Sequence, residues 1–177
     1  MTGTELASRL VEIRRAFDES FARPPPEAST GAVGLIAVRV GTQPFAFRID
    51  DLADVQERCK VIPVPGAHPN LLGIAGIRGR MVPVYSLAAL MGHARTDEWR
   101  WLAICRSKLE LGLTFDELEC YLQASPAELF PAAAGESERK GHVRDVLRQD
   151  GSTRLVIHTS SIIAALREAA GHSAKGS

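Results

Sequence analysis

The first residues of the chain carry large apolar side chains at helical spacing. These side chains recur every three or four positions, at Leu6, Leu10, Ile13, Phe17 and Phe21. The spacing predicts an amphipathic helix over residues 1–23, and the three prolines that follow it indicate a linker over residues 24–32. Burying one large apolar side chain is worth roughly 1.5–3 kcal/mol, so we expect this stripe to be covered. It can pack on the rest of the chain, bind a partner or mediate self-association.

From residue 33 onward the apolar positions follow short β-strand runs that are separated by turns. Leu35–Val40 and Phe45–Ile49 flank Gly41–Pro44, which is the pattern of a β-hairpin. An acidic break at residues 50–51 separates this hairpin from a further apolar run that begins at Leu52. The segment therefore predicts a hairpin followed by a third strand.

A second region of the chain repeats this pattern. When Leu35 is laid over Trp101, the two regions match without a gap, and the acidic break falls on residues 116–117. Further along, residues 71–91 and 142–166 each predict a second hairpin followed by a helix. Because side chains alternate along a strand with a period of two, agreement in register over a whole hairpin is informative. The chain is therefore predicted to contain two similar halves.

The two halves predict a fold class. Short antiparallel strands joined by tight turns are typical of closed barrels and sandwiches, because closure removes exposed strand edges. We therefore predict a mainly β fold of two packed, five-stranded SH3-like barrels, with an N-terminal amphipathic helix and a C-terminal helix. The barrels are expected at roughly residues 33–92 and 99–167, and residues 168–177 are expected to form a flexible tail.

The composition argues against binding to nucleic acids or membranes. Among 177 residues, Lys and Arg number 21 and Asp and Glu number 21, so the net charge is zero with neutral histidines. This balance removes the long-range attraction that such binding needs, and only 6% of the residues are aromatic. No apolar run approaches a bilayer span, and the first residues lack the pattern of a signal peptide. The three widely spaced cysteines predict no disulfide framework, so a reducing cytoplasm is the expected location.

The sequence shows no pattern typical of a catalytic or metal site. The five histidines have no ligand spacing with one another or with a cysteine. Cys59 and Cys105 lie in or beside strand runs, where a thiol behaves as a small hydrophobic side chain. The glycine-rich residues 73–79 lack the Lys-Ser/Thr ending of a phosphate-binding loop. We therefore expect no catalytic residue, no metal and no cofactor; an enzyme that uses Cys59 or His158 is the competing hypothesis.

Residues 62–87 carry a specific motif. They read as a proline-rich loop, a glycine-containing strand, an Arg-Gly turn and the run Pro-Val-Tyr-Ser-Leu, and they closely resemble the CheW-like family of chemotaxis coupling proteins. The residues that match the family pattern are Gly73, Arg78, Gly79, Pro83, Val84 and Leu87. The run Gly112–Asp116 is also similar to a family motif, and the resemblance covers about residues 33–167.

The resemblance implies the same two-barrel fold and an adaptor without enzymatic activity. Members of this family join the cytoplasmic tip of a chemoreceptor to the regulatory domain of a CheA-type histidine kinase. By matched position, the candidates for a receptor and kinase groove are Leu52, Asp54, Val55, Ile77, Arg78 and Trp101. Arg78 is expected either to bridge carboxylates or carbonyls near the groove or to hold the hairpin turn. Loops near residues 107–108 and 122–123 are expected to contact the kinase.

Three positions depart from the family pattern. Gly76 replaces the usual Asn, Ser86 replaces the usual Asp, and His158 stands where Asp is common. Together with the added N-terminal helix, these changes indicate a divergent member of a chemotaxis or pilus-motility array. They also motivate an alternative hypothesis, in which a protein-binding module of the same fold serves a different partner and no longer couples receptor to kinase.

Overall fold

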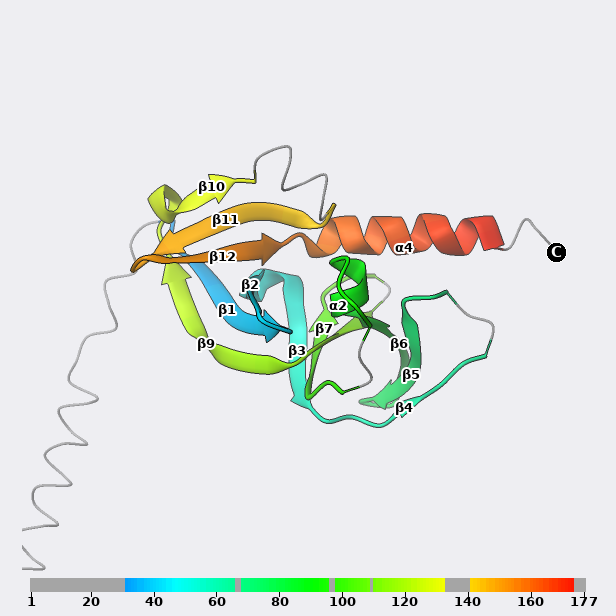
Figure 1. Ribbon diagram of the computed structural model, residues 1–177. Coiled ribbons are helices and arrows are strands. Elements are labelled where there is room, and N and C mark those ends of the chain that lie inside the picture. Colours follow the sequence, from blue (N-terminus) through cyan, green and yellow to red (C-terminus); the bar gives the residue numbers. More distant parts are fainter. Residues whose placement is uncertain (1–30, 66–67, 96–97, 109, 133–140, 174–177) are drawn as a thin grey trace, which may run out of the picture. The chain divides into compact units, whose positions relative to one another are not determined.

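The computed structural model describes residues 31–65, 68–95, 98–108, 110–132 and 141–173 (Figure 1). The described residues from Val33 onward belong to one compact unit. The helix predicted over residues 1–23 and nearly all of the predicted linker lie outside the described residues. The described part is mainly β-structure, which confirms the predicted class.

Two six-stranded sheets account for most of the described residues. The first sheet has the order β10-β11-β12-β2-β1-β9. Its strands are β1 (Val33–Val40), β2 (Gln43–Arg48), β9 (Glu117–Ala124), β10 (Leu129–Pro131), β11 (Val143–Gln149) and β12 (Ser152–Ile157). The second sheet has the order β3-β7-β8-β6-β5-β4. Its strands are β3 (Leu52–Glu57), β4 (Val61–Ile62), β5 (Leu71–Ile77), β6 (Arg80–Ser86), β7 (Trp101–Cys105) and β8 (Leu111–Phe115).

Helical segments connect the strands or follow them. Three are short: the 3-10 helices η1 (Ile49–Asp51) and η2 (Pro126–Glu128), and the α-helix α2 (Leu87–Leu90). The fourth, α4 (Thr159–Ser173), follows β12 and is the longest helix of the described part (Figure 1).

The two sheets do not follow the two halves of the sequence. The hairpin β1–β2 belongs to the sheet that holds β9 to β12, whereas the hairpin β7–β8 belongs to the sheet that holds β3 to β6. The exchange is symmetric: β1 pairs with β9 and β7 pairs with β3 in antiparallel fashion, while β2 pairs with β12 and β8 pairs with β6 in parallel.

The expected boundaries, 33–92 and 99–167, therefore do not coincide with the sheets. The acidic break after each first hairpin redirects the chain, so that the third strand of each half joins the other sheet. Both halves make the same exchange, so the strand pairing follows the repeat in the sequence. Each sheet also has one strand more than the expected five. The additional strands are β4 and β10, which lie at the sheet ends and contain only two and three residues.

One hydrophobic cluster contains side chains from both sheets. Phe45 and Phe47 of β2 and Leu113 and Phe115 of β8 are almost completely buried in it. The ring centroids of Phe47 and Phe115 lie 6.0 Å apart, so β2 and β8 meet directly. Burying each of these side chains contributes roughly 1.5–3 kcal/mol. The exchanged hairpins therefore supply the core that joins the two sheets.

Helix α4 is anchored in the same cluster and is longer than the sequence predicted. Ile162 and Leu166 are buried there, as the apolar spacing of residues 159–166 predicts. The segment after residue 167 was expected to be a flexible tail, but the helix continues to Ser173. The run Arg-Glu-Ala-Ala at 167–170 explains the difference, because all four residues are helix formers.

The first turn of α4 is held by a network that includes a histidine. The backbone N–H groups of Ser161 and Ile162 and the Ser161 hydroxyl all donate to the His158 carbonyl. The Ser161 Oγ also lies 3.0 Å from the Nδ1 of His142. Burial, and then repulsion from His158, lower the pKa of His142 below its ordinary value of 6.5. Folding therefore favours the neutral imidazole at this position.

We expect the free energy of unfolding to fall as the pH decreases from 6.5 through the lowered pKa of His142. In this window the unfolded chain binds a proton that the folded protein disfavours. The variant His142→Asn does not titrate and keeps an amide near Ser161, so its stability should depend less on pH. Urea unfolding of both proteins at about pH 8 and about pH 5 measures this difference. The same pH dependence in both proteins would contradict the expectation.

Gly73 lies where the backbone of β4 approaches β5 closely. Its φ is +153°, and a Cβ placed on it would lie 2.1 Å from the carbonyl oxygen of Ile62. A register shift interrupts the β5–β6 ladder between Leu71 and Gly73. Three residues further along β5, Gly76 has no left-handed φ and open space at the Cβ position. The two glycines lie on the same strand and can be compared directly. A side chain is sterically excluded at Gly73 but not at Gly76.

The variant Gly73→Ala should lower the free energy of unfolding by at least about 2 kcal/mol, because its methyl group collides with backbone that cannot move aside. Gly76→Ala is the control and should change it by no more than about 0.5 kcal/mol. Urea denaturation of the two variants tests the difference. Equal effects would show that the close approach at Gly73 does not constrain the sheet.

Candidate functional site

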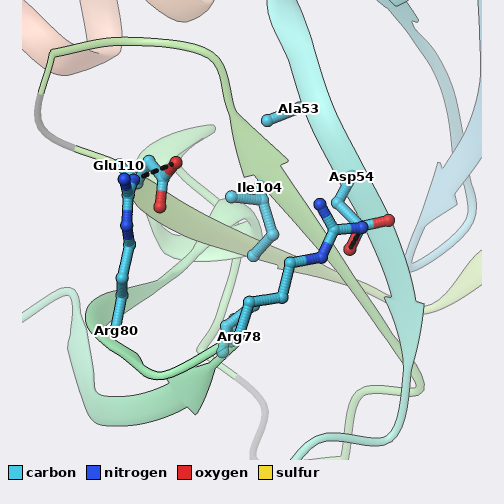
Figure 2. A pocket seen from close by; sticks show the side chains of 7 residues that line it. Ala53, Asp54, Arg78, Arg80, Ile104 and Glu110 are labelled. Carbon is cyan, nitrogen blue, oxygen red and sulfur yellow. Dashed lines mark hydrogen bonds and ion pairs between the residues drawn. The ribbon is translucent and has the colours of Figure 1, made fainter.

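A surface cavity of about 340 Å³ lies on the second sheet, beside the turn between β5 and β6 (Figure 2). We name it the Asp54–Arg78 groove. It is lined by Ala53, Asp54, Ile77, Arg78, Arg80, Ile104 and Glu110. These residues come from β3, from the β5–β6 hairpin, from β7 and from the residue just before β8.

The turn that carries Arg78 has a demanding backbone. Arg78 and Gly79 have φ values of 50° and 78°, and two consecutive left-handed residues define a type I′ hairpin turn. The equivalent turn between β11 and β12 has Asp150 and Gly151 at 49° and 73°. Asp tolerates this conformation, whereas a long side chain such as Arg is held in it at a cost of roughly 1–2 kcal/mol. The backbone alone therefore does not favour an arginine at position 78.

The side chain of Arg78 forms an ion pair across the groove. Its Nη2 lies 3.0 Å from the Oδ2 of Asp54. Asp54 is fixed by two further hydrogen bonds of 2.9 Å, because its carboxylate accepts from the Val55 N–H and from the Gln56 side-chain amide. The Arg78 side chain is 72% exposed and the Asp54 side chain 23%. An exposed pair of this kind contributes only about 0–1 kcal/mol, so its charges can be exchanged for those of a partner.

A second ion pair closes the opposite wall. The Nη1 of Arg80 lies 2.8 Å from the Oε1 of Glu110. Figure 2 shows Arg78 and Arg80 leaving the same hairpin toward different walls, with Ile104 between them. Ile77 and Ile104 are only 5% and 2% exposed and form an apolar floor. The groove therefore combines a buried apolar floor with acidic and basic groups on both rims.

The structure places three of the six predicted groove residues in this groove and three outside it. Asp54, Ile77 and Arg78 line it. Leu52 is buried in the shared core, because it points inward on the alternating strand β3. Val55 and Trp101 are half-buried against that core, and the Trp101 ring stacks on Phe115 at 6.5 Å.

Sequence reasoning missed four residues of the groove: Ala53, Arg80, Ile104 and Glu110. Ala53 and Arg80 are close in sequence to predicted members. Ile104 and Glu110 lie far away in the chain, and Ile104 enters only because β7 pairs with β3, where it stands opposite Asp54. Ile104 and Glu110 could have been predicted as groove residues only if the hairpin exchange between the sheets had been known.

The three departures from the family pattern have identifiable places. Ser86 is the N-cap of α2, and its Oγ accepts from the Ala89 N–H at 3.3 Å, a role that Asp fills equally well. His158 precedes α4, and its carbonyl accepts from the first turn. Gly76 is exposed on β5 opposite Met81, where it leaves the outer surface of the strand flat.

The cysteines and the possible metal ligands bear on the competing enzyme hypothesis. Burial raises the pKa of Cys105 to about 12 and also raises the pKa of Cys59, so both thiols stay protonated near neutral pH and are weak nucleophiles. Within the described ranges, no three His, Cys, Asp or Glu side chains are grouped as a metal site. No helix of the described part is long and apolar enough to cross a bilayer.

A family model, the CheW-like domain, matches residues 34–167 of the chain. This protein therefore belongs to the CheW-like family, as the motif in residues 62–87 predicted. The crystal structure of the scaffolding protein TtCheW from Thermoanaerobacter tengcongensis is similar, with a TM-score of 0.66 at 16% identity. The similarity covers 71% of this chain and 88% of that one, and it confirms the two-barrel SH3-like fold.

Three chemotaxis proteins named CheW are similar in sequence. That of Rhizobium meliloti is 26% identical over 139 residues, which cover 76% of this chain and 89% of the relative. That of Bacillus subtilis is 21% identical over 133 residues, covering 73% and 85%. That of Thermotoga maritima is 26% identical over 97 residues, covering 54% of this chain and 64% of the relative. These relatives are chemotaxis proteins, and the structural neighbour is a scaffold.

The variant Arg78→Asn should leave the free energy of unfolding unchanged or raise it, by no more than about 1 kcal/mol. Asn tolerates the left-handed backbone, and this relief offsets the loss of a weak surface ion pair. Arg80→Asn is the control, since it removes the neighbouring ion pair without relieving the turn. Urea denaturation measures both. A loss of more than about 1 kcal/mol in Arg78→Asn would show that the arginine is retained for stability.

Proposed function

We propose that this protein is a non-enzymatic adaptor that couples chemoreceptors to a CheA-type histidine kinase in a cytoplasmic chemosensory array. The output of that array is either chemotaxis or pilus motility. The observation that carries the proposal is the Asp54–Arg78 groove on a chain of the CheW-like family. An arginine stands there in a backbone conformation that disfavours it, and such local conflict is typical of functional positions.

The groove suits an amphipathic helix from a receptor tip. Helices that dock in grooves insert apolar side chains spaced three or four residues apart, while their charged side chains meet the rim. Here Ile77 and Ile104 offer the apolar contact, and the Asp54–Arg78 pair offers one charge of each sign. Because Asp54 is held by its own hydrogen bonds, it can exchange Arg78 for a basic group of the helix without losing its position.

The kinase is proposed to bind a separate surface on the second sheet. This replaces the expected loops near residues 107–108 and 122–123, of which residues 122–123 lie within strand β9. Ile62 of β4 and Met81 of β6 are 56% and 68% exposed, and Val64 just after β4 is also exposed. Of these residues, Ile62 lies on the edge strand β4 and Met81 lies on the interior strand β6. Large apolar side chains that are exposed close together on one sheet mark interaction sites. Phe130 of β10 occupies the equivalent position on the first sheet, where it is likewise exposed. None of these four residues lines the Asp54–Arg78 groove.

Binding measurements with the full chain test the two surfaces separately. We expect the wild-type protein to bind both a receptor-tip fragment and the regulatory domain of a CheA-type kinase by isothermal titration calorimetry. Arg78→Asn should weaken receptor binding at least tenfold, about 1.4 kcal/mol, and leave kinase binding unchanged. Met81→Glu should weaken kinase binding at least tenfold and leave receptor binding unchanged. Arg144→Asn, a change of an exposed residue on β11, is the control for both.

Two outcomes contradict the proposal. If the wild-type chain binds neither partner, it is not a coupling adaptor. If Arg78→Asn binds the receptor fragment as the wild type does, the Asp54–Arg78 groove is not the receptor site.

A second candidate function is a module of the same fold that serves a different partner. Gly76 favours it, since this glycine leaves a flat surface beside the exposed Met81 where the family usually has an Asn side chain. Genes for a receptor, a kinase and a response regulator next to this one would favour coupling. Their absence, together with failure to bind the kinase domain, would favour the alternative.

A further inference from the structure

The second sheet carries another cavity, of about 470 Å³, which shares no lining residue with the Asp54–Arg78 groove. We name it the Arg58–Trp99 pocket. It is lined by Arg58, Cys59, Val61, Pro63, Leu72, Arg95 and Trp99. Its volume lies within the range of about 300–1,000 Å³ that is usual for small-molecule sites.

The floor of the Arg58–Trp99 pocket is apolar. Leu72 is buried there, and Val61, Cys59 and Trp99 are partly buried against the same cluster. This cluster is the local core of the second sheet and includes Leu102. The pocket therefore opens onto the interior side of the sheet, and binding sites at the mouth of a barrel commonly have such apolar walls.

The rim of the pocket is basic. Arg58 has a φ of +42°, and its backbone N–H donates to the Arg100 carbonyl at 2.8 Å. Within the described part of the chain, the guanidinium of Arg58 forms no ion pair or hydrogen bond. The neighbouring acid, Glu57, is engaged by the Arg100 side chain at 2.8 Å. Arg58 therefore lines the pocket, and its guanidinium has no carboxylate partner among the described residues.

Arg95 forms part of the lining as well. Its Nη1 donates to the Pro69 carbonyl at 3.1 Å, which fixes the position of its guanidinium group. No Asp or Glu is among the described residues that line the pocket. A basic group next to an indole and aliphatic side chains is the arrangement that recognises an anion attached to an apolar body.

We propose that the Arg58–Trp99 pocket binds a small carboxylic acid with an aromatic or branched apolar body. The planar guanidinium of Arg58 matches a carboxylate, with which it can form two parallel hydrogen bonds. The apolar body lies against Trp99 and Leu72. A compact inorganic anion could use only the rim and would leave the floor empty, so the pocket should discriminate against it. This proposal does not depend on the adaptor function, because none of its residues lies in the groove.

Nuclear magnetic resonance of the ¹⁵N-labelled full chain tests the proposal. The protein has two tryptophans, and the indole N–H signal of Trp99 is assigned with the variant Trp99→Phe. The probes are phenylacetate, its uncharged analogue phenylacetamide, and inorganic phosphate. We expect phenylacetate to shift the Trp99 signal saturably, with a Kd between about 10 µM and 1 mM. Trp101, which stacks on Phe115, should respond much less.

The discriminating comparisons are chemical and mutational. Phenylacetamide should bind at least tenfold more weakly than phenylacetate, and phosphate should give no saturable shift of Trp99. Arg58→Asn, which suits the left-handed backbone, should weaken phenylacetate binding at least tenfold. Arg58→Lys should have an intermediate effect, because it keeps the charge but loses the planar fork. The matched control Arg144→Asn should bind as the wild type does.

The proposal is overturned if phenylacetamide binds as tightly as phenylacetate, since the carboxylate would then not be recognised. It is also overturned if phosphate produces the same shift, or if Arg58→Asn keeps its folded spectrum and full affinity. Absence of saturation at about 10 mM phenylacetate would equally overturn it, because that concentration is tenfold above the weakest expected Kd.

Discussion

The described structure depends on the exchange of hairpins between its two sheets, which the contact between Phe47 and Phe115 joins. Each residue lies on a hairpin that belongs to the other half's sheet, so neither half can complete a sheet alone. The same cluster receives Ile162 from α4 and Leu87 from α2. Assembly of one sheet therefore positions side chains for the other, and we expect the described unit to unfold as a single cooperative body.

This constraint also explains where the two cavities lie. The Asp54–Arg78 groove exists because β7, a strand of the second half, pairs with β3 of the first and brings Ile104 opposite Asp54. The Arg58–Trp99 pocket combines the residues after β3 with the segment that leads into β7. Both sites are therefore formed where segments from the two sequence halves meet on one sheet, and neither could exist in an isolated half.

The sequence predicted the repeated strands, the hairpin turn at Arg78 and the buried positions of α4, because these depend on local periodicity and turn chemistry. It could not predict which hairpin joins which sheet, since apolar alternation is the same for any partner strand. For that reason Leu52 was expected in the groove although it faces the core, and Ile104 and Glu110 were not expected there at all. The Arg58–Trp99 pocket left no local signal, because its lining comes from three separate segments.

Backbone strain connects the two cavities. Three non-glycine residues of the described part have a positive φ: Arg58, Arg78 and Asp150. The conformation of Asp150 is expected, because aspartate suits a type I′ turn. Asp150 is also not among the residues that line either cavity. The other two are arginines, for which the left-handed conformation has no local advantage, and each lines a separate cavity. A side chain that stands at a cavity against its backbone preference points to a role in binding there. The conformational conflict at Arg58 thus supports a ligand role by the same reasoning that supports a partner role for Arg78.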